Sequence, residues 1–373
     1  MRFKLAATAS LIFLFGSAFA QTDNNPEWSF AVSGDSRNCG DVVMPAIAEG
    51  VKRDHAEFYW HLGDYRAIYN FDEDYRQIHP TDNIATYEQQ AWQDFIDHQL
   101  MPFDVTVYLS LGNHETTPPK TRPDAIQAFA DWWDDPSIKS QRLADDPHNH
   151  TLRTYYHWIK PPVDFITLDN SSDDMFDADQ VKWFEDVLKR AAANDLVRSV
   201  VVGMHRALPD SLSTGHSMND SAQGIASGRR VYQDLVDFKK NTKKNVYVLA
   251  SHSHVSIGDV YNTACRRQHP ETILTGWIIG TAGAVRYQLP KDLEGAEKPQ
   301  NDLYGYLLGS VSQNGSIRFE FKPIEKTLSA IPDAVRKLYT DKFVQQCLEG
   351  NHSNYQPEGP AHPPKCPEYP PAK

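Results

Sequence analysis

The sequence predicts an α/β fold in which buried strands alternate with amphipathic helices. Apolar runs rich in β-branched residues end abruptly in polar residues, as buried strands do where they enter a loop. Stretches with helical periodicity lie between these runs. Folds of this kind bind ligands beyond the carboxyl ends of the strands, so the polar residues that follow each run are candidates for a functional site.

Six runs are predicted to be buried strands, counted with the polar residues that follow them. They occupy residues 28–35, 57–64, 106–115, 164–170, 198–205 and 245–254. After residues 275–287 the pattern changes to two alternating runs over 303–323, joined at Asn314-Gly315. Because Asn-Gly is a strong hairpin signal, these two runs are expected to form a hairpin.

Four amphipathic stretches between the strands are predicted to be helices. They occupy residues 41–53, 86–100, 179–194 and 229–241. A further helix is expected at about residues 331–348. The proline-rich residues 351–373 are expected to form an extended tail, held in place if Cys366 is bridged.

Residues 1–20 have the pattern of a secretory signal peptide. Arg2 and Lys4 precede a short apolar run that ends on Ala18-Phe19-Ala20. The run is too short to span a bilayer comfortably. The protein is therefore expected to be secreted or periplasmic, with no membrane contact after the signal peptide is removed.

The mature chain is expected to carry one domain over residues 21–350, followed by the tail. Its length and its 40% hydrophobic residues suit an ordinary globular core. The net charge is −12 for the whole chain and −14 without the two basic residues of the signal peptide. Because nucleic-acid surfaces are normally basic, no nucleic-acid polymer is expected as a partner. The sequence leaves the oligomeric state open.

The four cysteines are expected to form disulfides, because an exported chain meets an oxidising compartment. Four cysteines allow three pairings, and the sequence alone does not choose among them. Proximity along the chain favours Cys347 with Cys366, which leaves Cys39 for Cys265.

The predicted strand ends supply a set of residues with metal-binding chemistry. In chain order they are Asp35, Asp64, Asn113, His114, His205, His252 and His254. Carboxylate, amide and imidazole groups together suit a pair of divalent ions of borderline hardness, in which a bridging carboxylate holds the ions about 3.5–4 Å apart.

This series of motifs resembles the calcineurin-like metallophosphoesterase superfamily, whose pattern is D-x-H, G-D, G-N-H-[DE], H and G-H-x-H. The resemblance covers about residues 28–320, and "LGNHE" directly after an apolar run is its most specific piece. It implies a two-sheet β-sandwich flanked by helices, with a metal site at the carboxyl ends of the strands. It also implies a secreted metal-dependent phosphoesterase that hydrolyses a small phosphate mono- or diester.

The resemblance further implies two divalent metal ions and a role for each motif residue. One ion would be held by Asp35, Asp64 and His254, and the other by Asp64, Asn113, His205 and His252. In the family, a hydroxide held by the metals attacks phosphorus while the histidine of G-N-H, here His114, assists the leaving group. The nitrogen and oxygen ligands suit Mn, Fe, Zn or Co and select none of them.

Position 37 departs from the family pattern. The family has a histidine where this chain has Arg37, and the purple acid phosphatase branch, which lacks that histidine, uses a tyrosine at the position of Ala67. The first ion therefore keeps three inherited ligands, which still make an open catalytic site. Tyr65, Tyr69 or Cys39 could supply a fourth ligand, although each is off the family spacing.

Two residues are candidates for substrate binding. Arg37 either pairs with a nearby acid or faces the metal centre, where its guanidinium could bind phosphate oxygens through two hydrogen bonds, and the second interpretation is favoured. His216 lies in a long polar stretch over residues 206–230, which either carries function or is a solvated surface loop.

Two other functions compete with the hydrolase. The first is a non-catalytic phosphate- or nucleotide-binding protein with a degenerate first metal site. The second is a serine hydrolase built on "GHSMN", which lacks the last glycine of G-x-S-x-G and has no strand before it. The full set of metal ligands together with His114 favours the phosphoesterase.

Overall fold

A computed structural model of the protein describes residues 26–172, 175–359 and 366. The expected signal peptide lies outside the described residues, as does most of the tail beyond residue 359.

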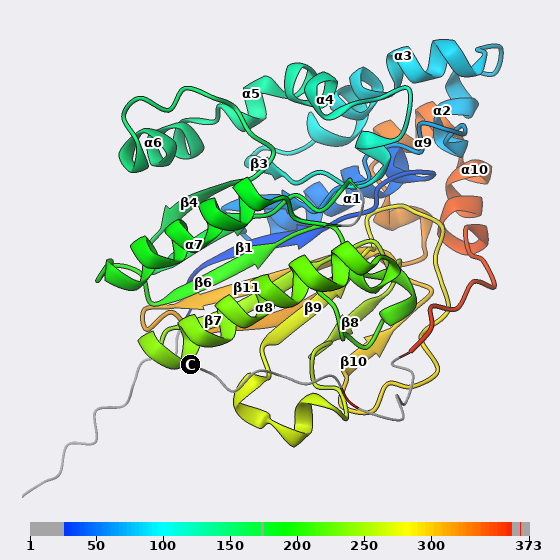
Figure 1. The fold of residues 1–373 in the computed structure, drawn as a ribbon. Helices are drawn as coiled ribbons and strands as arrows, with labels where there is room; N and C mark the ends of the chain where they lie inside the picture. Colours follow the sequence, from blue (N-terminus) through cyan, green and yellow to red (C-terminus); the bar gives the residue numbers. More distant parts are fainter. Residues whose placement is uncertain (1–25, 173–174, 360–365, 367–373) are drawn as a thin grey trace, which may run out of the picture.

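The strands form two sheets (Figure 1). The order in the first sheet is β12 (Ile317–Pro323), β11 (Gly305–Ser312), β1 (Pro26–Ser33), β2 (Phe58–His61) and β3 (Thr106–Leu109). The order in the second sheet is β10 (Glu297–Gln300), β8 (Ser256–Gly258), β9 (Thr275–Ile279), β7 (Asn245–Ala250), β6 (Ser199–Gly203), β5 (Val163–Thr167) and β4 (Tyr156–Lys160). The six predicted strands and the hairpin are confirmed, whereas β4, β8 and β10 lie outside the predicted runs.

Each sheet contains a run of parallel strands, and the strands outside these runs pair antiparallel. β1, β2 and β3 are parallel in the first sheet, and β5, β6, β7 and β9 are parallel in the second. Aromatic rings fill the space between the sheets: the ring of Phe165 on β5 lies 5.1 Å from those of Phe30 on β1 and Phe58 on β2. Because the two sheets pack directly on each other, the loops at their carboxyl ends can share one site.

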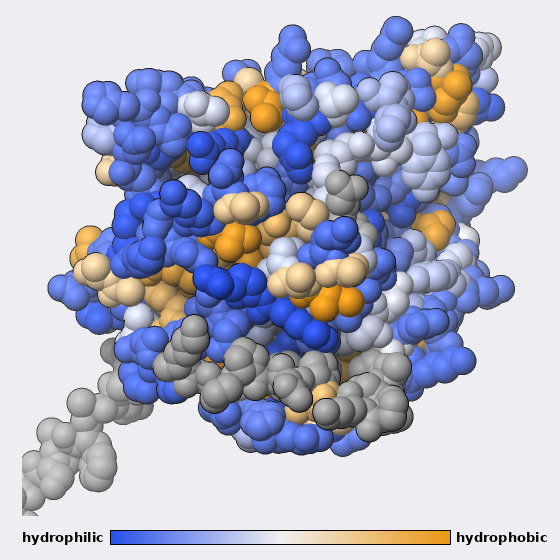
Figure 2. Space-filling model, in the orientation of Figure 1, coloured by the Kyte–Doolittle hydropathy of each residue, from blue (hydrophilic) through white to orange (hydrophobic). Residues whose placement is uncertain are grey.

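Helices cover the sheets on the outside (Figure 1). The four predicted helices are present as α1 (Gly40–Arg53), α3 (Ile84–Phe95), α7 (Ala178–Ala193) and α8 (Ala222–Thr242). The others are α2 (Glu73–Ile78), α4 (Arg122–Ala128), α5 (Ala130–Trp133), α6 (Pro136–Asp145), α9 (Asp333–Tyr339) and α10 (Asp341–Gln345). The face that carries α7 and α8 is mainly hydrophilic at its edges and has several hydrophobic patches near the two helices (Figure 2).

Two helix predictions need correction. α8 begins at Ala222 because the Ser221 side chain accepts a hydrogen bond from the Gly224 N–H, so the long polar loop ends about eight residues earlier than expected. The helix expected over 331–348 is divided into α9 and α10 at Thr340, whose φ of 66° breaks the helical path.

The expected disulfide pairing is wrong. Cys39 is bridged to Cys347, with 5.8 Å between the Cα atoms, and Cys265 to Cys366, with 5.5 Å. α9 packs against α1, and this brings Cys347 to Cys39 at the start of α1. Proximity along the chain was a poor guide because the C-terminal helices return to the N-terminal part of the fold.

Candidate metal centre

Polar side chains from five strand ends lie together at one edge of the two sheets. Asp35 follows β1, Asp64 follows β2, Asn113 follows β3, His205 follows β6, and His252 and His254 follow β7. Possible ligand atoms of Asp35, Asp64, His205 and His252 all lie within 4.8 Å of one another. Both sheets therefore contribute to one cluster, as expected for residues at the carboxyl ends of parallel strands.

The backbone turns sharply at this cluster. Asp35, Asp64 and His252 have φ values of 62°, 61° and 66°, and such left-handed conformations are commoner for aspartate and histidine than for most residues. Gly63 has a φ of 93°, and a Cβ there would lie 2.3 Å from the backbone nitrogen of Gly112. The loops after β2 and β3 therefore approach each other only because this position is glycine.

Nε2 of His205 and three other possible ligand atoms lie close together. His205 donates through Nδ1 to the Leu62 carbonyl at 2.9 Å, which directs Nε2 toward Asn113 Oδ1 at 3.1 Å, His252 Nδ1 at 3.0 Å and Asp64 Oδ1 at 3.3 Å. Burial opposes a charge on His205, but the Asp64 carboxylate outweighs it and raises the pKa to about 9. The pocket thus favours a positive charge, and a metal ion that displaces this proton would find four ligands.

A second group of ligand atoms lies beside the first. Asp35 Oδ1 and Asp64 Oδ2 are buried and have no hydrogen-bond partner. His254 donates through Nδ1 to the Val285 carbonyl at 2.6 Å, and its Nε2 lies 3.3 Å from Asp35 Oδ1. Buried carboxylate oxygens without donors are what a missing cation would leave, so these three residues also fit a metal ion.

Arg37 reaches into this second group. One terminal guanidinium nitrogen lies 3.4 Å from His254 Nε2, and its Nε lies 3.9 Å from Asp64 Oδ2. The side chain is only 14% exposed, and its buried Nε has no hydrogen-bond partner. The guanidinium therefore faces the cluster.

His114 lies at the edge of the cluster with a fixed orientation. It donates through Nδ1 to the Ala67 carbonyl at 2.7 Å, and its Nε2 lies 3.6 Å from Asp64 Oδ2. Burial, aided by the charge of Arg37, lowers the pKa of His114 to about 4. The backbone at position 67 thus supplies the orienting group that the sequence did not reveal.

Three other residues were candidates for a fourth ligand to the first ion, and two of them have different partners in the structure. Tyr65 is buried and donates its hydroxyl to the Ser110 carbonyl at 2.7 Å, and Cys39 is in a disulfide. Tyr69 is 59% exposed, and its ring lies 5.0 Å from that of His114. Ala67 has no ligand atom in its side chain, and its backbone carbonyl accepts a hydrogen bond from His114 instead.

His216 contacts the cluster through His252. Its ring stacks on that of His252, with 3.9 Å between centroids and 9° between planes. The rings of Tyr287 and Tyr355 lie 5.6 and 5.4 Å from it. The stretch that carries His216 thus contributes to the wall of the site.

Glu115 is a structural residue of the site whose role the sequence did not reveal. Its carboxylate accepts hydrogen bonds from three backbone N–H groups, those of Asp64 at 2.9 Å, Tyr65 at 2.8 Å and Gly112 at 2.7 Å. Burial and the nearby Asp64 charge raise the pKa of Glu115 to about 8. Glu115 holds together the two loops that carry Asp64 and Asn113, and its place in "GNHE" was the only signal for it.

A buried ion network supports the loop between Asp64 and α2. Arg66 is fully buried and pairs with four aspartates, Asp41, Asp72, Asp74 and Asp94. Asp72 also accepts the Ala67 N–H at 3.1 Å. The network therefore anchors the residue whose carbonyl orients His114.

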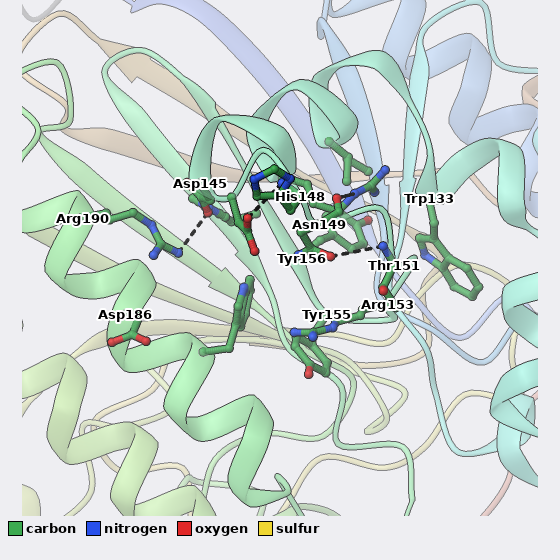
Figure 3. A pocket seen from close by; sticks show the side chains of 15 residues that line it. Trp133, Asp145, His148, Asn149, Thr151, Arg153, Tyr155, Tyr156, Asp186 and Arg190 are labelled. Carbon is green, nitrogen blue, oxygen red and sulfur yellow. Dashed lines mark hydrogen bonds and ion pairs between the residues drawn. The ribbon is translucent and has the colours of Figure 1, made fainter.

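A separate pocket of about 370 Å³ lies beside β4 and includes none of the clustered residues (Figure 3). Trp133, Tyr155 and Trp183 contribute to its lining. On its rim Arg190 pairs with Asp145 at 3.0 Å. Asp145 also pairs with His157 at 2.6 Å, and this pocket contains none of the candidate metal ligands.

His157 in this pocket should make stability depend on pH. Its Nδ1 and Nε2 lie 2.8 Å from Asp164 and 2.6 Å from Asp145, so both nitrogens must carry hydrogen. Burial opposes the charge, but the two carboxylates raise the pKa of His157 from 6.5 to about 9. A raised folded-state pKa stabilises the fold fully below pH 6.5 and less as the pH rises through 9.

We therefore expect His157→Gln to lower the free energy of unfolding by on the order of 3 kcal/mol near pH 6. The difference from the wild type should shrink as the pH rises through 9. Chemical denaturation of both proteins across this range measures it. A difference that is constant with pH would contradict a charged His157.

The family model for calcineurin-like phosphoesterases matches residues 30–256, more than half of the chain. Among solved structures, purple acid phosphatase PPD1 from yellow lupin (Lupinus luteus) seeds is similar, with 15% identity and a TM-score of 0.54. The match covers 79% of this chain and 51% of that one, so this chain spans about half the length of the lupin protein. At this identity the likeness shows the fold.

Two further structures are more distant. GAP50, the anchor in the inner membrane complex of Plasmodium, has 14% identity and a TM-score of 0.48, with coverage of 79% of this chain and 84% of that one. PhoD has 14% identity and a TM-score of 0.46, with coverage of 90% and 75%. No curated protein matches the sequence significantly.

Proposed function

The chain belongs to the calcineurin-like phosphoesterase family, and from this premise we propose that it is a metal-dependent hydrolase of small phosphate esters that acts at the strand-end cluster. One observation carries the proposal. Asn113 Oδ1, His252 Nδ1 and Asp64 Oδ1 lie 3.1, 3.0 and 3.3 Å from His205 Nε2, and the neighbouring Asp64 Oδ2 is buried without a hydrogen-bond partner.

We assign the metal ligands by these contacts. Asp64, Asn113, His205 and His252 would hold one ion, and Asp35, Asp64 and His254 would hold a second, with Asp64 as the bridge. When bound, divalent ions polarise the phosphoryl oxygens and make a water molecule more acidic. The hydrogen bonds of His205 to Leu62 and of His254 to Val285 orient their free nitrogens toward the cluster.

Arg37 and His216 are proposed to bind the substrate phosphate. The guanidinium of Arg37 has a buried nitrogen without a partner and can donate to phosphoryl oxygens. His216 is held by ring stacking against His252, one of the proposed metal ligands.

His114 is proposed to assist the leaving group. Its Nδ1 is held by the Ala67 carbonyl, so only Nε2 is free to exchange a proton with substrate. In the free protein the low pKa leaves Nε2 without a proton at neutral pH. A phosphate dianion bound beside it favours the imidazolium, because opposite charges stabilise each other.

The His114→Ala variant tests this role. We expect it to keep its metal and to lower kcat by about 10²–10⁴, the usual range for a general acid. The loss should be smaller for esters with acidic leaving groups, since these need less protonation. An equal loss for good and poor leaving groups would exclude proton donation by His114.

The Arg37→His variant tests the departure at position 37. It replaces a fixed positive charge with the family ligand, so we expect more metal bound per chain and a higher KM for phosphate esters. Arg37→Leu is the matched control, because it removes the charge without adding a ligand; it should raise KM as well but bind less metal than Arg37→His. Metal titration measures the metal bound per chain, and steady-state kinetics measure KM. If neither value changes in Arg37→His, Arg37 has no role in binding the metal or the substrate.

We further propose that the enzyme is exported, with residues 21–350 as its catalytic domain. Two disulfides suit an oxidising compartment. Within the described residues, no helix has the length and apolar character needed to cross a membrane.

The direct test is hydrolysis of a chromogenic phosphate ester by the purified protein, before and after chelation and after metal is restored. We expect the protein to hydrolyse the ester, to lose this activity when a chelator is added and to regain it when metal is restored. The position of Arg37 near His254 also fits a non-catalytic phosphate-binding protein. Phosphate binding without hydrolysis under any metal would favour that function.

A further inference from the structure

Tyr69 stands out among the described residues as an exposed aromatic ring beside the proposed leaving-group residue. It is 59% exposed, and its ring lies 5.0 Å from the ring of His114 with 31° between the planes. Large apolar side chains on a surface lose contact with water when a ligand covers them, so such a ring next to a reaction centre marks a binding surface.

The backbone holds Tyr69 in this position. Ile68 is fully buried and has a φ of 64°, a conformation that is rare for a β-branched residue. Strain of this kind persists only where the surroundings enforce it, and here the Ile68 N–H donates to the Tyr87 hydroxyl at 3.2 Å. The turn directs Ile68 into the core and Tyr69 out beside the site.

One carbonyl links Tyr69 to His114. The Ala67 carbonyl accepts the Tyr69 N–H at 2.8 Å and the His114 Nδ1–H at 2.7 Å. The Asp72 carboxylate in turn holds the Ala67 N–H at 3.1 Å. The position of the Tyr69 backbone relative to His114 is therefore determined by short hydrogen bonds.

We propose that Tyr69 binds an aromatic leaving group, so that the preferred substrates are phosphate monoesters of phenols. This rests on the proposed function, in which His114 Nε2 meets the leaving oxygen. Nδ1 of His114 is hydrogen-bonded to the Ala67 carbonyl, and the exposed ring of Tyr69 lies 5.0 Å from the imidazole ring. A ring bonded directly to the leaving oxygen would thus lie against the tyrosine ring.

The reaction is an ordinary hydrolysis. The bond between phosphorus and the phenolic oxygen breaks with its electron pair on that oxygen, and a bond from water oxygen to phosphorus forms. The attacking water releases one proton and the phenolic oxygen takes one up through His114 Nε2, so the products are a phenol and inorganic phosphate. A nucleoside monophosphate also carries an aromatic ring, but a ribose separates that ring from the leaving oxygen. We therefore commit to the aryl ester, and the nucleotide is an arm of the test.

The test compares three esters with the metal-loaded protein: phenyl phosphate, hexafluoroisopropyl phosphate and adenosine 5′-monophosphate. The first two have leaving groups of similar acidity, and only the first is aromatic. We expect Tyr69→Ala and Tyr69→Leu to lower the ratio of kcat/KM for phenyl phosphate to that for the fluoroalkyl ester by about 3- to 10-fold, as loss of an aromatic contact should. Tyr69→Phe keeps the ring and should keep the ratio.

Leu196→Ala is the matched control, because it removes an exposed apolar side chain (66% exposed) before β6, at the other end of the sheet. An unchanged ratio in Tyr69→Ala, or a loss confined to the nucleotide, would overturn the proposal while the hydrolase stands. A wild type that hydrolyses none of the three esters would overturn the proposed function itself.

Discussion

Replacing Asp64 with asparagine is expected to remove most of the bound metal and to lower ester hydrolysis by on the order of 10³-fold or more. Its two oxygens face the two ligand groups: Oδ1 lies 3.3 Å from His205 Nε2, and Oδ2 is buried without a partner beside Arg37. Asparagine keeps the shape but removes the charge and replaces one oxygen with an amide nitrogen, which does not bind a metal ion. Metal content by elemental analysis and turnover of a chromogenic ester measure the effect.

Asp104→Asn is the control for this variant. It makes the same chemical change at an exposed carboxylate, paired with Lys52 before the start of β3. His205→Ala should behave like Asp64→Asn, because it removes the centre of the four-ligand group. Normal turnover with normal metal content in Asp64→Asn would exclude the bridging role, and circular dichroism establishes that the fold survives.

Arg66→Leu should have the largest effect on stability. The guanidinium is fully buried and contacts Asp41 at 2.5 Å and Asp74 at 2.9 Å, and it also pairs with Asp94 and Asp72. Removing one partner of a buried ion pair leaves uncompensated charge, which costs about 3–5 kcal/mol. Chemical denaturation of both proteins at neutral pH measures the loss.

Two comparisons make this prediction specific. Arg336→Leu removes an exposed arginine that is paired twice with Asp341, and it should change the free energy of unfolding little. The cost of Arg66→Leu should also shrink at acidic pH. In the wild type Arg66 lowers the pKa of Asp94 despite burial, so that stabilisation is lost as the pH falls. A cost equal to that of Arg336→Leu would mean that solvent reaches the aspartates.

Local patterns predicted most of the fold and the candidate ligands. Strands β1, β2, β3, β5, β6 and β7 follow from apolar runs, since a buried strand needs a local run of apolar residues. β4, β8 and β10 were not predicted. β8 is three residues long, and "EKPQ" in β10 is polar, so neither produces a clear signal. The start of α8 was also missed, because "SAQGIASG" is rich in small and polar residues, which are typical of a loop. In the structure Ser221 caps a helix that begins at Ala222.

The amino-acid sequence by itself determined the order of strands and helices and the seven residues from Asp35 to His254 that the candidate centre brings together. Each of these depends on neighbours in the chain: a strand, the turn that ends it and the polar residue in that turn. The tertiary structure alone decided the pairing of Cys39 with Cys347, the orientation of His114 by Ala67 and the approach of Arg37 to His254. These contacts join residues that are far apart in sequence, or use a backbone carbonyl, which every residue has. Their formation depends on how helices and sheets pack, which a local pattern of side chains does not encode.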